Sequence, residues 1–470
     1  MPEPANEKEA RFKRARPYLL LAVPFLLLAP YVLGGHGLGF DERGHMSAAR
    51  QFFGAVARPS TFPAVLKDYD STSGPLLFLL LGLWGGLTGF SPVAMRLLML
   101  AASWLTVVLF YRLLRERRAA CPLAAAFLLL FSPYFFLMSF MALPHNPSMI
   151  FGLLALTYAL RGAERGGRNL WLAMLFSTLA SLCRQTWLFL PAAVATAWAW
   201  ERGREILRPE RAGRRFDPRR GLADAPALAA PFLVMGALFL YWGGFTNAAR
   251  LTRFAQICAN ARLDANVTEL RLRPEFLNFF LVFTGAYFGV SVLLRPAPWR
   301  RATLAASALL PLFFIFPVRF VFGGGILLRL SDALAGRTFA LAADLFLLAL
   351  WGLGALALAR AFLERPAAPP VKGGPAAEAG GHAAEAGGPV AGGRGVLLWA
   401  MVFFVAANAV AGRLWERYMV EIVPFLILAL LAHVERRRPV LYAWLAFQAC
   451  LAVGFACYKC FVQFGNAHFF

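Results

Sequence analysis

Long apolar runs separated by short polar turns make up most of the chain. A helix needs about 20 apolar residues to cross a bilayer, and runs near that length recur about thirteen times. This pattern predicts an all-α, polytopic transmembrane helical bundle. A further run, residues 75–87, is short and glycine-rich, and we expect it to enter the membrane without crossing it. The predicted spans are residues 17–34, 93–112, 120–138, 147–160, 169–183, 187–200, 228–245, 276–294, 301–318, 338–362, 396–412, 419–434 and 439–458.

Composition agrees with this pattern. Of the 470 residues, 59% are hydrophobic and only 15% are charged, whereas a soluble chain of this length would expose far more charge. The charged start followed by the apolar run 18–33 could be a signal peptide, but the many later spans favour an uncleaved first helix. The six cysteines form no zinc-type or disulfide pattern, and we interpret Cys457 and Cys460 as small residues on a membrane helix.

The net charge of +22 is explained by topology. If the N-terminus is cytoplasmic and 75–87 does not cross, seven cytoplasmic segments carry 30 of the 47 lysines and arginines, as the positive-inside rule expects. A crossing at 75–87 would invert every later loop and break that rule repeatedly. We therefore predict thirteen crossings. No basic face with interleaved exposed aromatics appears, so nucleic acid is not an expected partner.

This topology places polar segments on the extracytoplasmic side. They include the loop 36–74, for which amphipathic helices are predicted, the turns 144–147 and 184–186, and the segment 412–418. Three regions follow: a catalytic transmembrane module over 1–363, a Gly/Ala/Pro-rich, disordered cytoplasmic linker over 364–395, and C-terminal transmembrane helices over 396–470.

The first outer loop opens with Asp41, Glu42 and His45. Apolar positions after them recur at helical spacing, which predicts an amphipathic helix on the membrane surface. Acidic residues in the first turn can simply favour the helix dipole. The alternative is a catalytic base, which needs a carboxylate within reach of an acceptor hydroxyl. Neighbouring helix positions diverge by about 100°, so one of the pair faces the reacting centre, and we select Asp41. His45 could orient its carboxylate.

Two further groups could contact the acceptor or the sugar. Asp68 and Asp70 lie near the end of the first loop, either as hydroxyl ligands or as part of a solvated turn. His145 and Asn146 lie between two prolines at a predicted outer membrane edge, where they either cap the loop or bind a sugar hydroxyl.

Arginines at the outer membrane edge are the candidates for phosphate binding. Arg184, followed by Gln185 and Thr186, lies between two apolar runs with almost no loop. Such an arginine can snorkel, but a guanidinium also suits bidentate binding of a phosphate. A second group precedes the run from residue 419, and it consists of Arg413, Glu416, Arg417 and Tyr418. There we take Arg417 as the phosphate ligand and Glu416 as its partner.

Several common motifs are missing from the sequence. There is no P-loop, G-x-G-x-x-G, H-E-x-x-H or D-x-D motif, which argues against a soluble nucleotide-sugar enzyme with a bound metal. No cofactor is firmly implied, although a divalent metal is possible.

These motifs together resemble the GT-C-type integral membrane glycosyltransferases. Asp41-Glu42-x-x-His45, Ser71–Leu76, Ser132–Phe136 followed by Pro147–Phe151, and above all Arg184-Gln185-Thr186 are most similar to the terminal α-1,2-glucosyltransferases of lipid-linked oligosaccharide assembly. The likeness covers roughly residues 1–200. Arg417-Tyr418 and Pro424 resemble a broader GT-C pattern.

The resemblance implies an inverting transferase (EC 2.4 class) that uses a sugar carried on polyprenyl or dolichyl phosphate. Asp41 or Glu42 would be catalytic, and Arg184, Arg417 and Arg413 would bind the donor phosphate. The remaining candidates would contact substrate: His45, Asp68, Asp70, His145, Asn146, Gln185, Thr186, Glu416 and Tyr418. The acceptor is a glycan, lipid or protein.

The composition is typical of bacteria, so we expect an inner-membrane protein that works on cell-envelope glycans with its site facing outward. The alternative is a lipid-linked-glycan flippase, for which charge at mid-membrane and paired broken helices are expected. Here the polar residues gather on one face.

Overall fold

The structure is a computed structural model, and it describes the following residues: 5–34, 40–69, 71, 73–165, 167–207, 218–245, 272–289, 292, 300–316, 318, 327, 340–363, 393–410, 416–434 and 438–457. Within these ranges the regular elements are helices, and no strand is present. The predicted all-α fold is confirmed.

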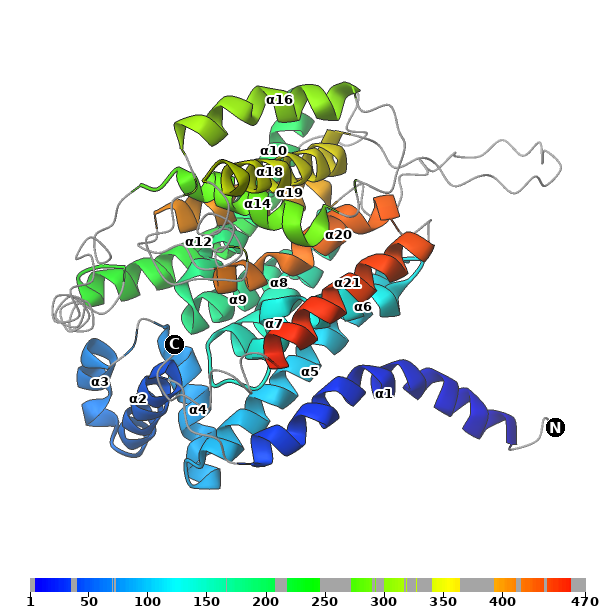
Figure 1. Cartoon of the computed structure of the whole chain (residues 1–470). Helices are drawn as coiled ribbons and strands as arrows, with labels where there is room; N and C mark the ends of the chain where they lie inside the picture. Colours follow the sequence, from blue (N-terminus) through cyan, green and yellow to red (C-terminus); the bar gives the residue numbers. More distant parts are fainter. Residues whose placement is uncertain are drawn as a thin grey trace.

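The α-helices follow one another with short connections (Figure 1). They are α1 (Ala5–Leu33), α2 (Phe40–Ala57), α3 (Phe62–Asp68), α4 (Pro75–Thr88), α5 (Pro92–Glu116), α6 (Pro122–Leu130), α7 (Pro133–Met138), α8 (His145–Arg165), α9 (Arg168–Cys183), α10 (Phe189–Leu207), α12 (Pro218–Trp242), α14 (Glu275–Phe288), α16 (Arg300–Ile315), α18 (Ala340–Leu363), α19 (Arg394–Ala409), α20 (Val423–Val434) and α21 (Arg438–Cys457). Short 3-10 segments are η1 (Pro59–Thr61), η2 (Gln185–Leu188) and η4 (Glu416–Glu421).

Four of the described helical segments are long and apolar enough to cross a membrane: Phe12–Leu33, Pro92–Glu116, Gly221–Trp242 and Leu341–Leu363. Shorter apolar helices accompany them, including α4, α14 and α19. These helices indicate an integral membrane protein. The number of crossings and the side that each loop faces stay predictions.

The run 120–138, predicted as one span, is two helices. α6 ends at Leu130 and α7 begins at Pro133. Ser132 between them has an extended backbone (φ −62°, ψ 129°). Proline lacks a backbone N–H and disfavours the helical conformation in the residue before it, so the helix cannot continue through Ser132. The break turns the chain toward the segment that precedes α8.

The helix predicted after Asp41 is present as α2, with Asp41 and Glu42 in its first turn. Met46, Ala49 and Phe52 point into a buried cluster, as their spacing predicted. α2 packs on α4, and the two are drawn together at the lower left of Figure 1. A Cβ at Gly82 of α4 would lie 2.7 Å from the carbonyl oxygen of Ala49, so a glycine permits this close crossing. The glycine-rich run 75–87 is thus explained by helix packing.

The first-loop helices are also fixed to the end of α12. Tyr241 Oη donates to the carbonyl of Pro63 (2.7 Å), and Trp242 Nε1 donates to that of Leu66 (2.9 Å). The region 40–88 therefore forms a second, smaller apolar core together with residues of α5 and α12. Apart from its last three residues, the predicted linker 364–395 lies outside the described residues.

Candidate functional site

Arg184 stands at a chain reversal between two packed helices. α9 ends at Cys183, Arg184 is extended (φ −156°, ψ 119°), and η2 starts at the next residue. The backbone N–H of Arg184 still donates to Ala180 (2.9 Å), and its carbonyl accepts from Trp187 (3.1 Å). Both backbone groups are satisfied locally, so the side chain is held in one place by a well-bonded backbone.

Among the described residues, the guanidinium of Arg184 has three polar neighbours, two of which are distant in sequence. Nε lies 2.6 Å from Oε1 of Glu421 and donates to Thr186 Oγ1 at 2.9 Å. Nη1 lies 2.8 Å from Nε2 and 3.1 Å from Nδ1 of His145. The plane also lies over the ring of Tyr418, with Cζ 4.6 Å from the ring centroid. We call Arg184, His145, Thr186, Tyr418 and Glu421 the arginine cluster.

Glu421 is the acidic centre of this cluster. Thr186 Oγ1 donates to its Oε2 (2.8 Å), and His145 Nδ1 lies 3.5 Å from its Oε1. The side chain of Glu421 is 1% exposed, whereas that of Arg184 is 10% exposed. Attraction between charges is stronger where water is excluded, so both side chains are held tightly.

One edge of the guanidinium is still available. In the part of the chain that the structure describes, Nη2 of Arg184 makes no hydrogen bond, and the side chain keeps some exposure. A phosphate oxygen that approached this edge would meet a fixed cation whose position needs no rearrangement.

The first turn of α2 reaches the same end of the molecule. Arg96 of α5 donates from Nε and Nη2 to the two oxygens of Glu42 (3.0 and 2.7 Å), and the Ala142 N–H donates to Oε1 (3.1 Å). His45 Nδ1 donates to the carbonyl of Ala142 (2.7 Å). Ala142 precedes His145 by three residues, so one short segment joins the acidic turn to the arginine cluster.

A second connection comes from the end of the first loop. The N–H of Gly74 donates to the carbonyl of Cys183 (3.0 Å), next to Arg184. A Cβ on Gly74 would lie 2.0 Å from the Leu182 carbonyl oxygen, so no other residue fits without movement. Tyr69 Oη donates to the Ser73 carbonyl (2.6 Å) and shapes the turn. The first loop is therefore closed directly onto the residue before Arg184.

Asp41 and Glu42 have different surroundings. Glu42 is fully buried in its pair with Arg96, while Asp41 is partly exposed. Asp68 ends α3 and is exposed, and Asp70 lies outside the described residues. Of the predicted pair, Asp41 is thus the carboxylate that solvent reaches.

The other predicted site residues also differ in their surroundings. Asn146 Nδ2 donates to the Met138 carbonyl (2.9 Å) and closes the turn before α8, as expected of a loop cap. Gln185 is partly exposed in η2. Arg413 lies outside the described residues, and Glu416 and Arg417 belong to η4 with side chains that are not described.

Sequence reasoning missed Glu421, Arg96 and Ala142. Glu421 does carry a signal, because it is a single carboxylate within the predicted span 419–434, where an ionised group is costly without a partner. Its partner in the structure is Arg184, 237 positions earlier in the chain. Among the described residues, no group of three or more His, Cys, Asp or Glu side chains could hold a metal ion.

Comparison with known proteins gives one family. Residues 72–211 match the family described as dolichyl-phosphate-mannose-protein mannosyltransferase. The match covers less than a third of the chain, from the turn before α4 to the end of α10, and it includes Arg184. No curated protein and no solved structure matches the chain. The match supports a glycosyltransferase of the GT-C type, and with it a lipid-linked sugar donor and a separate acceptor.

Proposed function

We propose that this protein transfers a hexose from a polyprenyl-phosphate carrier to an acceptor on the extracytoplasmic side of the membrane. The observation that carries the proposal is the buried arginine cluster, which the segment 142–145 joins to the first turn of α2. This arrangement supports the proposal because it brings a fixed cation and the carboxylates of the first loop to one end of the molecule.

Arg184 is the proposed ligand of the donor phosphate. As the bond between the anomeric carbon and the phosphate oxygen breaks, negative charge grows on the leaving phosphate. A fixed cation at that point stabilises the transition state more than the ground state. Glu421 and Thr186 hold Nε, and His145 holds Nη1, so the remaining edge points in a defined direction. Arg417, at the start of η4, and Arg413, which precedes η4 in the sequence, are further proposed ligands.

Asp41 is the proposed base. Its carboxylate accepts the proton of the acceptor hydroxyl while that oxygen bonds to the anomeric carbon, and this single displacement inverts the anomeric centre. Glu42 suits this task less well, because its oxygens already accept from Arg96 and Ala142 in a site without solvent.

The finer identity of the substrates is also a proposal. The motifs of the first 200 residues favour glucose, and the matched family is named for mannose, so we propose a hexose. Asp68, Asp70 and Gln185 are proposed acceptor or sugar contacts. His45 and Asn146, which are buried and bonded to backbone carbonyls, are proposed to shape the site around the substrate. The acceptor is a glycan, a lipid or a protein.

The test is turnover of a polyprenyl-phosphate hexose by the purified protein in lipid nanodiscs, with Asp41→Asn as the variant. Removing a general base should lower turnover by about 10²–10⁴-fold, while donor binding is kept. Glu42→Gln should lower turnover per folded molecule by a smaller factor. Full activity in Asp41→Asn would refute the assignment, and transport of labelled donor without any product would favour the flippase.

A further inference from the structure

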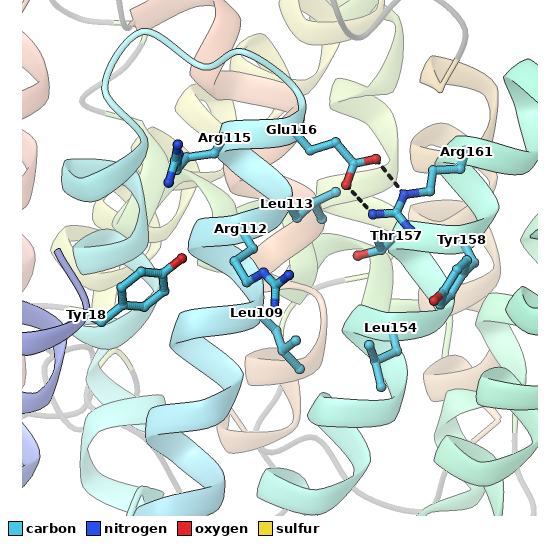
Figure 2. A pocket seen from close by; sticks show the side chains of 10 residues that line it. All are labelled: Tyr18, Leu109, Arg112, Leu113, Arg115, Glu116, Leu154, Thr157, Tyr158 and Arg161. Atoms are coloured by element: carbon cyan, nitrogen blue, oxygen red, sulfur yellow. Dashed lines mark hydrogen bonds and ion pairs between the residues drawn. The ribbon is translucent and has the colours of Figure 1, made fainter. Parts of the chain in front are cut away.

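A cavity of about 600 Å³ lies at the other end of the bundle from the arginine cluster. It opens between α1, the last turns of α5 and the last turns of α8 (Figure 2). α8 starts at His145 and reaches the cavity at residues 154–161, which is about 14–24 Å further along the helix axis. The cavity and the arginine cluster are therefore separated by much of a membrane's thickness.

The cavity carries an excess of positive charge. Arg112, Arg115 and Arg161 line it, with Glu116 as the one carboxylate of the lining. Glu116 is engaged with Arg161, since both of its oxygens accept from that guanidinium at 2.6 Å. Figure 2 shows this pair bridging α5 and α8, with Arg112 below it and Arg115 on the other side of α5, toward Tyr18. Two guanidinium charges are left in excess.

Arg112 and Arg115 carry this excess charge. Arg112 makes no ion pair or hydrogen bond with the described residues, and Arg115 lies over the ring of Tyr111 (5.9 Å to the centroid). They are three positions apart on α5, so they share a helix face. Both are exposed and so remain open to a ligand.

Beside the charged side chains, the lining combines leucines with the hydroxyl-bearing Tyr18, Thr157 and Tyr158. Leu109 precedes Arg112 by three positions on α5, and Leu154 lies on α8. Tyr18 of α1 closes the cavity on one side (Figure 2). An inorganic anion would contact the arginines and leave the leucine side chains uncovered. An amphiphile would contact the arginines with its headgroup and the leucines with its acyl chains. Basic pockets between membrane helices are a known type of site for anionic lipid headgroups.

We propose that this cavity binds one anionic phospholipid, with its phosphodiester on Arg112 and Arg115 and its acyl chains along Leu109 and Leu154. This site is separate from the site of the proposed transfer reaction. A lipid bound there would stabilise the contact between α1, α5 and α8, so the stability of this contact should depend on the lipid composition of the membrane.

Native mass spectrometry of the purified full chain with phosphatidylglycerol or phosphatidylcholine tests this. Phosphatidylglycerol should be retained preferentially, and Arg112→Gln with Arg115→Gln should weaken its binding by about thirty-fold, since each surface arginine contributes about a factor of five. Arg168→Gln is the matched control, because Arg168 is exposed at the start of α9 and does not line the cavity. It should change binding little.

A second variant acts in the opposite direction. Glu116→Gln removes the carboxylate and frees Arg161, so it should tighten phosphatidylglycerol binding by several-fold even if the double variant folds poorly. Equal retention of both lipids, or an equal loss in Arg168→Gln, would overturn the site. Displacement of the lipid by glycerophosphoglycerol, which has the headgroup without acyl chains, would show that only the phosphodiester is recognised and would overturn the lipid assignment.

Discussion

Two buried arginine–carboxylate pairs lie at the same end of the molecule and are built differently. Arg96 and Glu42 are joined by two parallel hydrogen bonds, and Glu42 also accepts from the backbone of Ala142. Arg184 meets Glu421 through Nε alone and shares its remaining contacts with Thr186, His145 and the Tyr418 ring.

The difference indicates two tasks. The bidentate pair, 2% and 0% exposed, fixes α2 against α5 and the segment before α8. The pair in the arginine cluster keeps one edge of the guanidinium without a hydrogen bond to the described residues, so it can hold an anion without first breaking a bond. We therefore expect the first pair to determine stability and the second to determine turnover.

The largest effect should come from Arg96→Ala. It leaves Glu42 buried without its partner, and breaking a buried pair in this way costs about 3–5 kcal/mol. The melting temperature of the purified protein should fall clearly. Replacing both partners, with Arg96→Met and Glu42→Leu, should restore most of the stability, because no charge is left unpaired. A stable Arg96→Ala protein would show that the pair does not hold the first loop.

Arg184→Ala should lower turnover by about 10²–10³-fold, the usual loss when one preorganised donor to a developing charge is removed. Arg184→Lys should recover part of this, since an ammonium is a point charge and lacks the planar fork. Donor turnover per folded molecule is the measurement. To separate stability from chemistry, Glu421→Gln is added to Arg184→Ala, where it should improve folding and leave activity low. Wild-type turnover in Arg184→Ala would move phosphate recognition to Arg417 or Arg413.

Gly74→Ala tests the contact between the first loop and the arginine cluster. Its Cβ would meet the Leu182 carbonyl, and overpacking of this kind costs about 1–3 kcal/mol. The melting temperature and turnover should both fall. Gly54→Ala is the control within α2, where nothing lies within 4 Å of the new methyl group, and there it should stabilise the helix by about 0.5–1 kcal/mol. Equal behaviour of the two variants would contradict the docked loop.

The smallest effect belongs to the pair between Arg161 and Glu116 at the other end of the bundle. These side chains are 36% and 34% exposed, so solvent screens their attraction. A double-mutant cycle with Arg161→Gln and Glu116→Gln should give a coupling of about 0.2–1 kcal/mol in the melting of the protein. A coupling as large as that of the buried pairs would mean that the membrane shields this end.

Much of the helical fold could be predicted from the order of residues, because each apolar run satisfies its backbone hydrogen bonds within itself. The α2 helix, the buried positions Met46 and Phe52, and the polar turn at Arg184 were all visible in this way. Pro133 is a signal for the break between α6 and α7, but the uninterrupted apolar run 120–138 led to the prediction of a single span.

The partners of the charged side chains were not visible. The carboxylate that meets Arg184 is Glu421, which comes from the other half of the chain. The predicted pair of Glu416 with Arg417 stays a prediction, because these side chains are outside the described part of the structure. Sequence spacing predicts contacts within one helix, but it does not specify which ends of distant helices meet. The burial of Glu42 likewise depends on Arg96 and Ala142, which no local pattern connects to it.

The sequence by itself determined the helices, the membrane character and the polar residues at their ends, because helix formation and transfer into lipid depend on local composition. Only the tertiary structure decided which carboxylate is buried in an ion pair, which one faces solvent, and which arginine keeps an edge open. Those outcomes depend on the packing of α2 on α4, of α5 on α8 and of α8 on η4. The interaction of two charges is set by their separation and by the water that such packing excludes.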